Sequence, residues 1–507
     1  MHDLSPAQRG ALAASLAHDL ADADYGSRSL RELWGDVADD ALSRGNAVPA
    51  RRALGRHPDS PLATLATLFF VGDASESRAA AVALSQVGIE GATELGLLQR
   101  VGDDVRATAA IRPYGFTDAN GEDEWWIASD LDELAGVSPL RDDHVLGVGG
   151  AGRTLAGLLG EEPVASALDL GCGCGIQALH LSRHAARVVA TDISARALWF
   201  TSLNAALNGV SGIETRLGSL FDPVAGDVFE RIAANPPFVI TPRTDGVPRY
   251  EYRDGGLDGD DLMAAVVGSV GEHLASGGVA TLLGNWETRE DAAGLDRVRG
   301  WVDGSPVPLD AWVLERERLD PARYAEVWVR DGGTRPGSEA YDTLLGAWLD
   351  DFDRRGVTGV GLGWMLLRRP ADAPTLARYE AVGSAPGTLS GLVSGAFAAH
   401  DRLVTLDGEA LASSRLLVAP DVTEARHHLP GEEGPSVLEL RQGGGLARRL
   451  EVDSALAAVV GACDGELPLG VLVDAVAQLL EVDPAALRAD VLPRVRDLVF
   501  TGFLGFA

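Results

Sequence analysis

The stretch ASALDLGCGCGIQALHLSRHAARVVATDIS, residues 165–194, decides the fold. It has the pattern of a buried strand, a glycine-rich turn, an apolar helix and a second strand ending at Asp192. Gly171, Gly173 and Gly175 allow a tight turn that a ligand can approach closely, and the helix beyond the turn offers free N–H groups. The Asp192 carboxylate follows about 20 residues on, where it can accept hydrogen bonds from ribose hydroxyls. The stretch therefore predicts a nucleoside-binding α/β unit.

Strand-like and helix-like segments continue to alternate to about residue 370, which is typical of a parallel sheet covered by helices. The further strand-like runs are ETRLGSLFD (214–222), FERIAANPP (229–237), GGVATLLGNW (277–286), AWVLERERL (311–319) and VTGVGLGWMLLRR (357–369). We expect the last of these to be antiparallel to the others.

Two motifs carry a family resemblance. The D-x-G-x-G-x-G spacing of residues 169–175 resembles the nucleoside-binding loop of class I S-adenosylmethionine (SAM)-dependent methyltransferases. The tetrapeptide Asn235-Pro236-Pro237-Phe238, after the fourth strand-like run, resembles methyltransferases acting on a planar, conjugated nitrogen. Such nitrogens are the exocyclic amines of adenine or guanine and the amide of glutamine. The resemblance implies a Rossmann-like, seven-stranded class I methyltransferase domain over residues 141–370.

The residue types of the tetrapeptide suit that chemistry. A delocalised lone pair attacks a methyl group poorly until neighbouring acceptors hold its protons and orient it. The Asn235 side-chain oxygen and the Pro236 carbonyl supply two acceptors, and the Phe238 ring can stack on the planar group. We expect Asn235, Pro236 and Phe238 to be catalytic, with no metal required.

The family also implies cofactor contacts around the glycine turn. Asp169 is expected near the methionine ammonium of SAM, and Gly171, Gly173, Gly175 and Asp192 are expected to line the nucleoside. Ser219 and Leu220, after the third strand, occupy the place of residues that contact the adenine ring. His144-Val-Leu-Gly147-Val-Gly149, before the first strand, is positioned to line the pocket from the other side.

The substrate cues conflict. Residues 252–259, YRDGGLDG, resemble the GG-x-DG stretch of HemK-type glutamine methyltransferases, whereas Phe238 resembles ribosomal RNA and small-RNA methyltransferases. The first hypothesis is an N-methyltransferase acting on a nucleic-acid base, with RNA favoured. The alternative is a protein glutamine N5-methyltransferase. A third possibility is a SAM-binding regulator that does not catalyse, so the expected partners are RNA or a protein substrate.

Simpler interpretations remain for several of these residues. The glycines can serve a turn in a non-binding Rossmann-like fold, and Asn235 can simply begin a turn before proline. Cys172 and Cys174 occupy variable positions of the turn where small residues pack, and no second cysteine pair accompanies them, which argues against a metal site.

The flanks differ from the centre. Residues 1–140 predict a helical or winged-helix domain, with a helix starting at Ser5-Pro6 and a hairpin turning at Gly102. Residues 371–507 predict an α+β domain that ends in an amphipathic helix within VLPRVRDLVFTGFL (491–504).

The net charge of −31 is concentrated in the flanks. Residues 151–250 hold 8 arginines and 9 acidic residues, whereas residues 1–150 hold 12 arginines and 24 acidic residues. This distribution disfavours a surface that coats nucleic acid but permits a single base at the active site. Three cysteines and the absence of a signal or membrane-spanning pattern lead us to expect a soluble cytoplasmic protein.

Overall fold

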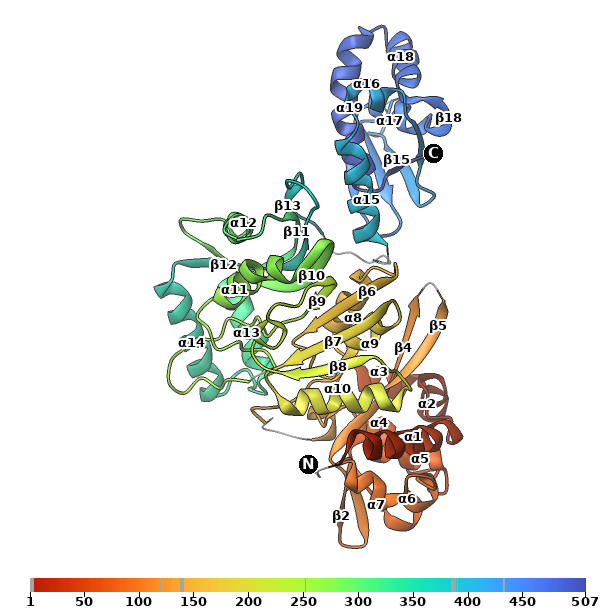
Figure 1. The fold of residues 1–507 in the computed structure, drawn as a ribbon, viewed down its shortest axis with the longest axis vertical. Coiled ribbons are helices and arrows are strands. Elements are labelled where there is room, and N and C mark those ends of the chain that lie inside the picture. The colour runs from red at the N-terminus through yellow and green to blue at the C-terminus, as the bar shows by residue number, and fades with distance from the viewer. Residues whose placement is uncertain are drawn as a thin grey trace. The chain divides into compact units, whose positions relative to one another are not determined.

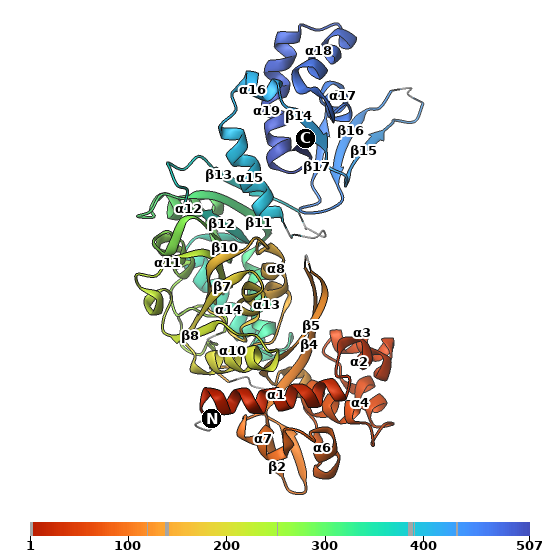
Figure 2. The same ribbon diagram turned by 45° about the vertical axis from the view of Figure 1, so that its right-hand side comes forward.

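The computed structural model describes residues 4–118, 120–136, 141–250, 252–383, 389, 391–431 and 434–507 (Figures 1 and 2). The chain forms two compact units. The first comprises 1–156, 161–309 and 318–372, and the second comprises 157–160, 310–317 and 373–507. The boundary predicted after residue 140 falls at the end of a stretch outside the described residues.

The first unit begins with helices and a small antiparallel sheet of order β1-β3-β2. Ser5 starts the first helix as predicted, because its hydroxyl accepts the Gln8 N–H at 3.3 Å while Gln8 Oε1 accepts the Ser5 N–H at 3.0 Å. The predicted hairpin turns at Gly102, where φ is 65°. The elements are α1 (Pro6–Asp22), α2 (Ser27–Trp34), α3 (Asp36–Ser43), α4 (Val48–Leu54), α5 (Pro61–Leu65), the π-helix η1 (Ala66–Val71), β1 (Ala74–Glu76), α6 (Ser77–Ala83), α7 (Gly88–Glu94), β2 (Leu98–Val101), β3 (Asp104–Ala107), β4 (Ala109–Asp118), β5 (Gly121–Asp130) and η2 (Glu133–Ala135).

An α/β, Rossmann-like sheet follows. Its strands in the first unit are β6 (Val164–Leu170), β7 (Ala185–Asp192), β8 (Ile213–Leu217), β9 (Phe229–Ala234), β10 (Leu274–Arg289) and β12 (Val357–Arg368), in the spatial order β12-β10-β9-β6-β7-β8. Strands β10, β9, β6, β7 and β8 are parallel, and β12 is antiparallel to β10, which confirms the expected orientation of the late strand.

The sheet has eight strands rather than the seven that the family resemblance implies. The additional strand arises because β13 (Ala377–Ala381), beyond the predicted end of the domain at residue 370, pairs in parallel with β11 (Asp310–Leu319).

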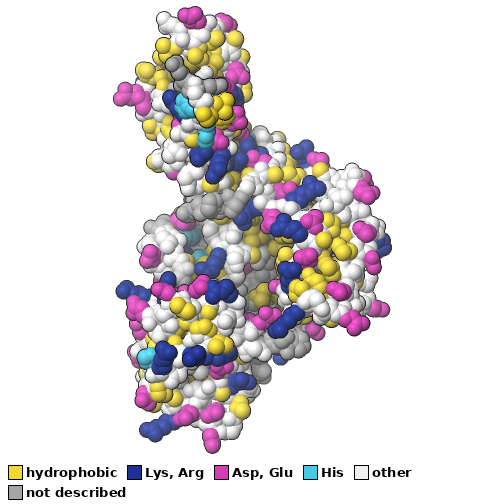
Figure 3. All heavy atoms as spheres, turned by 180° about the vertical axis from the view of Figure 1, so that it is seen from behind, with side chains coloured by type: hydrophobic (Ala, Val, Ile, Leu, Met, Phe, Trp, Pro, Cys, Tyr) yellow, Lys and Arg dark blue, Asp and Glu magenta, His cyan; other side chains and the backbone are white. Residues whose placement is uncertain are grey.

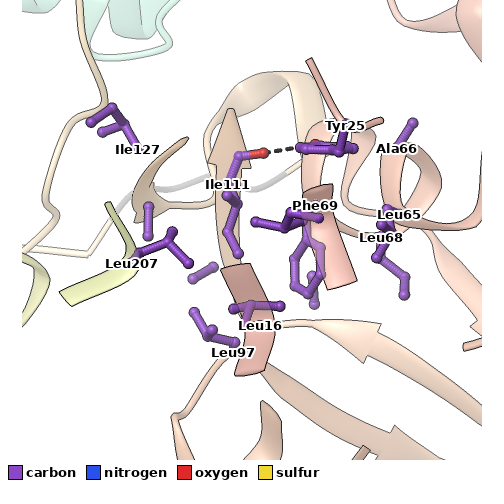
Figure 4. Close-up of a cluster of buried hydrophobic side chains, with 14 of the residues drawn as sticks. Leu16, Tyr25, Leu65, Ala66, Leu68, Phe69, Leu97, Ile111, Ile127 and Leu207 are labelled. Atoms are coloured by element: carbon purple, nitrogen blue, oxygen red, sulfur yellow. Dashed lines mark hydrogen bonds between the residues drawn. The ribbon is translucent and has the colours of Figure 1, made fainter. Parts of the chain in front are cut away.

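One hydrophobic core joins the N-terminal helices to the helices of the Rossmann-like sheet. Leu16 and Phe69 pack in the same buried cluster as Phe200 and Leu207 of α10 (Ala195–Leu207), and α1 lies beside α10 in Figures 1 and 2. Figure 4 shows part of this cluster, in which the Tyr25 hydroxyl donates to a backbone oxygen of β4 at 2.7 Å. The other helices of the unit are α8 (Gly150–Leu158), α9 (Ile176–Ser182), η3 (Asp222–Val224), α11 (Asp261–Val270), η4 (Gly271–His273), α12 (Gly294–Asp303), α13 (Pro321–Asp331) and α14 (Glu339–Arg354).

Asn204 of α10 and Asn208, which caps the C-terminus of this helix, hydrogen-bond to β5 as a neighbouring strand would. Asn204 Oδ1 accepts the Ala128 N–H at 2.7 Å and its Nδ2 donates to the Ala128 carbonyl at 2.9 Å. Asn208 does the same for Trp126, at 2.9 and 2.8 Å. Four helical residues advance about 6 Å and two strand residues about 7 Å, so the two spacings match. The side chains thereby supply hydrogen-bond partners to backbone N–H and carbonyl groups on the edge of β5 that faces away from β4.

The second unit contains two three-stranded antiparallel sheets, of order β18-β14-β19 and β15-β16-β17. The predicted C-terminal helix is confirmed: α19 ends at Phe500, shortly before Gly502 with φ of 82°. The elements are α15 (Leu392–Val404), α16 (Gly408–Ala412), β14 (Arg415–Val418), β15 (Val422–His427), β16 (Val437–Gln442), β17 (Arg449–Val452), α17 (Ser454–Gly461), β18 (Asp464–Pro468), α18 (Leu469–Leu480), α19 (Pro484–Phe500) and β19 (Leu504–Phe506). None of the helices in the described part of the chain has the length and apolarity needed to cross a membrane.

Candidate active site

The glycine turn joins β6 to α9. Gly171, Gly173 and Gly175 have φ of 75°, 54° and 83°, a region that side chains disfavour. A Cβ atom on Gly171 or Gly173 would meet no described atom within 4 Å, so this part of the turn borders open space. A Cβ on Gly175 would lie 2.8 Å from the Thr201 side chain in α10. The first two glycines therefore leave room for a ligand, and the third allows close helix packing.

Asp192 links the end of β7 to the glycine turn. Its Oδ2 accepts the Gly173 N–H at 3.0 Å and its Oδ1 accepts the Ser194 N–H at 2.8 Å. Burial raises the pKa of Asp192, and these backbone bonds oppose that rise. Each carboxylate oxygen retains a further lone pair, which suits it to receive ribose hydroxyls.

Asp169 is almost fully buried, with 1% of its surface exposed. Its Oδ2 accepts the N–H of Ala178, in the first turn of α9, at 2.8 Å. Burial raises the pKa of Asp169 to about 7, the bond from Ala178 lowers it, and the nearby Asp192 carboxylate raises it. Asp169 therefore connects β6 to α9 through this hydrogen bond. Because its pKa lies near neutral pH, a bound ligand cation would favour the ionised carboxylate.

The segment after β8 lies next to the end of β7. The Gly218 N–H donates to the backbone oxygen of Asp192 at 3.0 Å. The two residues that follow are the predicted adenine contacts: Ser219 is exposed, and Leu220 is half-buried with φ of 47°, rare for a side-chain-bearing residue. The structure thus brings Ser219 and Leu220 close to Asp192.

The Asn-Pro-Pro-Phe segment emerges beside the glycine turn, because β9 is the parallel neighbour of β6 and Ala234 pairs with Leu170. Asn235 is half-buried there. The Phe238 N–H donates to the Pro236 carbonyl at 2.7 Å, which closes a tight turn. One lone pair of the Pro236 oxygen is thereby used inside the turn, and the second is the one left for a substrate N–H.

Two braces hold this turn from outside. On one side, Phe238 forms an antiparallel bridge with Asp254, in the GG-x-DG-like segment. On the other, the hydroxyl of Tyr324 accepts the Ile240 N–H at 3.1 Å and an N–H of Asn285 at 2.5 Å, with both side chains fully buried. Sequence reasoning missed Tyr324 and Asn285, which lie 39 residues apart in α13 and β10 with no shared motif.

Five buried polar atoms around this edge of the sheet lack a hydrogen-bond partner among the described residues. They lie beside the glycine turn, beside Asp192, beside the Asn-Pro-Pro-Phe segment and in the segment before α8: Gln177 Oε1, Thr191 Oγ1, Thr241 Oγ1, Asn285 Oδ1 and His144 Nε2. Buried polar groups without partners are rare in folded proteins. Together with the open space at Gly171 and Gly173, they fit a polar ligand of the kind the sequence predicts.

The cysteines of the turn are buried thiols. Burial raises the pKa of Cys174 to about 12, and it raises that of Cys172 further above the ordinary range. Cys172 Sγ accepts the Thr201 hydroxyl at 3.2 Å. Within the described ranges, no group of three or more His, Cys, Asp or Glu side chains is arranged to hold a metal ion.

Three family models match the chain. Residues 148–247 match the methyltransferase small domain. Residues 22–108 match a domain of unknown function (DUF7059), and residues 397–505 match another domain of unknown function (DUF7782).

Individual relatives match the central region. The release factor glutamine methyltransferase of Xylella fastidiosa is 33% identical over 127 residues, 24% of this chain and 46% of the relative. The ribosomal protein uL3 glutamine methyltransferase of Bradyrhizobium diazoefficiens is 30% identical over 181 residues, 33% of this chain and 54% of the relative. The ribosomal RNA small subunit methyltransferase C of Alcanivorax borkumensis is 30% identical over 120 residues, 24% of this chain and 32% of the relative. The chain spans about half the length of the first two relatives and about a third of the last.

Proposed function

We propose that this chain, which contains a class I SAM-dependent methyltransferase domain, transfers a methyl group from SAM to the side-chain amide nitrogen of a glutamine in a protein. The family and the cofactor predicted from the sequence are confirmed by the match over residues 148–247. The observation that carries the proposal is the Asn-Pro-Pro-Phe turn at the end of β9, directly beside the glycine turn at the end of β6.

The chemistry assigned to this chain is orientation and proton handling. When bound, SAM supplies an electrophilic methyl group. Asp192 and the glycine turn would hold its nucleoside, with Ser219 and Leu220 beside the base and Asp169 near the ammonium. The Asn235 oxygen and the remaining lone pair of the Pro236 oxygen would accept the two N–H groups of the amide. Phe238 would cover the amide plane.

The substrate assignment reverses the order favoured by the sequence. Two of the three relatives described above are named as glutamine methyltransferases, which supports the alternative hypothesis over the nucleobase hypothesis. Charge points the same way: the flanks are acidic, and carboxylate side chains are interspersed with arginines on the face shown in Figure 3. A nucleobase amine remains the second candidate, because the ribosomal RNA relative and Phe238 favour it.

The N-terminal segment is proposed to serve protein contact. From α5 to β3 its elements follow the order helix, strand, two helices and two strands, with the sheet order β1-β3-β2, which supports a winged-helix interpretation. Residues 1–150 carry twice as many acidic residues as arginines, which disfavours phosphate binding by this part. We propose residues 1–140, 141–370 and 371–507 as three functional parts of the chain, the first of which shares its hydrophobic core with the second.

The test uses methyl-labelled SAM and a cell lysate. Protein-directed transfer predicts label that protease removes and ribonuclease spares, and fragmentation mass spectrometry should place the methyl group on a glutamine. Label destroyed by ribonuclease instead would refute the glutamine proposal and support the base. Asn235→Ala should abolish transfer while calorimetry shows SAM affinity within about twofold of the wild type. If the protein binds SAM but transfers label to no fraction, the result would contradict both transfer hypotheses and support the third one, a SAM-binding regulator that does not catalyse.

A further inference from the structure

His144 occupies an unusual position for a histidine outside the recognised motifs. Only 4% of its surface is exposed, and its Nε2 is buried without a hydrogen-bond partner in the described part of the chain. Its Nδ1 lies 4.0 Å from Oδ2 of Asp130. The ring also packs edge-on against Tyr252, with centroids 5.9 Å apart.

Asp130 is held rigidly at the end of β5. Its Oδ2 accepts the Val145 N–H at 2.9 Å, and its own N–H donates to the Val145 carbonyl at 3.0 Å. Both carboxylate oxygens also accept Nε–H of Arg196, at 2.9 and 3.0 Å. These contacts fix the backbone next to His144 and place a negative charge on the Nδ1 side of its ring.

His144 lies between the two halves of the candidate site. On one side is Arg196, in the first turn of α10 and four residues after Asp192. On the other side is Tyr252, two residues before Asp254, which bridges Phe238. The ring therefore packs against the segment that leads to the Phe238 bridge, and it lies 4.0 Å from Asp130, the carboxylate that holds Arg196.

We propose that His144 is a further catalytic residue: its Nε2 shares one of the two substrate N–H groups with an oxygen of the Asn-Pro-Pro-Phe turn, and it takes the proton that the nitrogen loses on methylation. This rests on the proposed N-methyl transfer. The nitrogen forms a bond to the methyl carbon, the carbon–sulfur bond breaks with its electron pair left on sulfur, and one N–H proton passes to Nε2 and then to solvent. The role requires the tautomer with its proton on Nδ1, which the Asp130 carboxylate 4.0 Å away favours and which leaves the lone pair on Nε2.

The surrounding charges favour a neutral ring before the reaction. Burial lowers the pKa of His144, the carboxylates of Asp130 and Asp132 raise it, Arg196 lowers it and Asp143 raises it, with a net lowering. The imidazole is therefore an available acceptor at neutral pH. As the pH falls through this lowered pKa, Nε2 gains a proton and the rate should fall.

The first experiment reports on His144 without any substrate. Nitrogen-15 NMR of the full chain saturated with S-adenosylhomocysteine should show His144 neutral at pH 7 with the proton on Nδ1, and His144→Gln assigns the resonance. A protonated ring, or a proton on Nε2 at pH 7, overturns the proposal. This result is independent of whether the acceptor is glutamine or a base, and of whether transfer is detected at all.

The second experiment measures transfer to whichever lysate fraction the wild type labels. His144→Ala should lower kcat about 10²- to 10³-fold, the range typical of a lost general base, with S-adenosylhomocysteine affinity changed less than about threefold. His144→Gln, which restores an acceptor oxygen, should recover part of kcat and lose the acid limb of the pH profile. The exposed His57→Ala is the matched control. An unchanged kcat, or an affinity loss as large as the kcat loss, overturns the catalytic role, whereas no transfer by the wild type defeats the proposed function instead.

Discussion

Replacing Asn204 tests how the N-terminal part is connected by hydrogen bonds to the glycine turn. Its side chain is fully buried and makes three hydrogen bonds: it accepts from the Ala128 N–H, and its two N–H groups donate to the oxygens of Ala128 and Cys174, the latter at 2.8 Å. Asn204→Ala removes all three bonds and leaves buried backbone groups of β5 and of the turn unpaired. Each bond contributes about 0.5–1.5 kcal/mol net, and a stranded buried partner costs about 1–3 kcal/mol. We expect Asn204→Ala to lower the free energy of local opening of β5 and the glycine turn by about 3–5 kcal/mol.

Asn208→Ala is the matched control, one helical turn along. Asn208 makes the same pair of bonds to Trp126, but both residues are only half-buried. Water can replace the lost contacts there, so we expect a cost of about 1 kcal/mol.

Hydrogen exchange followed by mass spectrometry measures the effect where it occurs. Peptides covering residues 121–130 and 171–178 should exchange faster in Asn204→Ala, and only the first should change appreciably in Asn208→Ala. Local exchange reports on the two peptides separately, which a melt of a chain with two compact units does not. Equal effects of the two substitutions, or unchanged exchange in residues 171–178, would refute the assignment of Asn204 as a joint between β5 and the glycine turn.

Three further predictions concern the cofactor side. Asp192→Asn should weaken S-adenosylhomocysteine binding by roughly ten- to hundredfold in calorimetry, because bonds to a charged acceptor are worth about 1.5–3 kcal/mol; unchanged affinity would contradict the ribose role. Gly175→Ala should lower the melting temperature more than Gly212→Ala. The two glycines have nearly the same φ, 83° and 84°, but only a Cβ at position 175 would meet a neighbour closer than 3 Å. Asp169 has a pKa of about 7 in the folded chain and about 4 when unfolded, so the folded state holds an extra proton and loses stability as pH rises from 4 to 7. Asp169→Asn should flatten that slope in thermal melts, and an equal slope would count against the buried acid.

The features predictable from the sequence are those set by local or periodic signals. Ser5 before a proline, the glycine turn after a buried strand and the antiparallel run at 357–369 each leave a pattern within a few residues. The joint at Asn204 leaves none, because its partner Ala128 lies 76 residues away and contributes only backbone atoms. The bond uses the backbone N–H and carbonyl that every residue except proline carries, so the alanine at position 128 does not signal the contact.

The candidate site shows the same division. The turn, Asp192 and Asn235 could be predicted as site residues because their residue types and order match a known chemistry. Tyr324 and Asn285 support the Asn-Pro-Pro-Phe turn through a hydroxyl bonded to a backbone N–H, a role that depends on position in space rather than on a motif. The strand count also differed from the family expectation, because pairing of β13 with β11 is decided by tertiary contacts.

The position of Asn204 constrains how the N-terminal part can take part in the reaction. A recognition domain attached by a flexible linker could move without affecting the cofactor turn. Here a single amide contacts both β5 and the turn, and the N-terminal helices share their hydrophobic core with α10. If the N-terminal part binds the substrate, as proposed, we expect that binding to affect the geometry of the glycine turn, and we expect a ligand at the turn to affect substrate binding in return. The shared core and the Asn204 bonds therefore favour a single rigid body over a separately moving module.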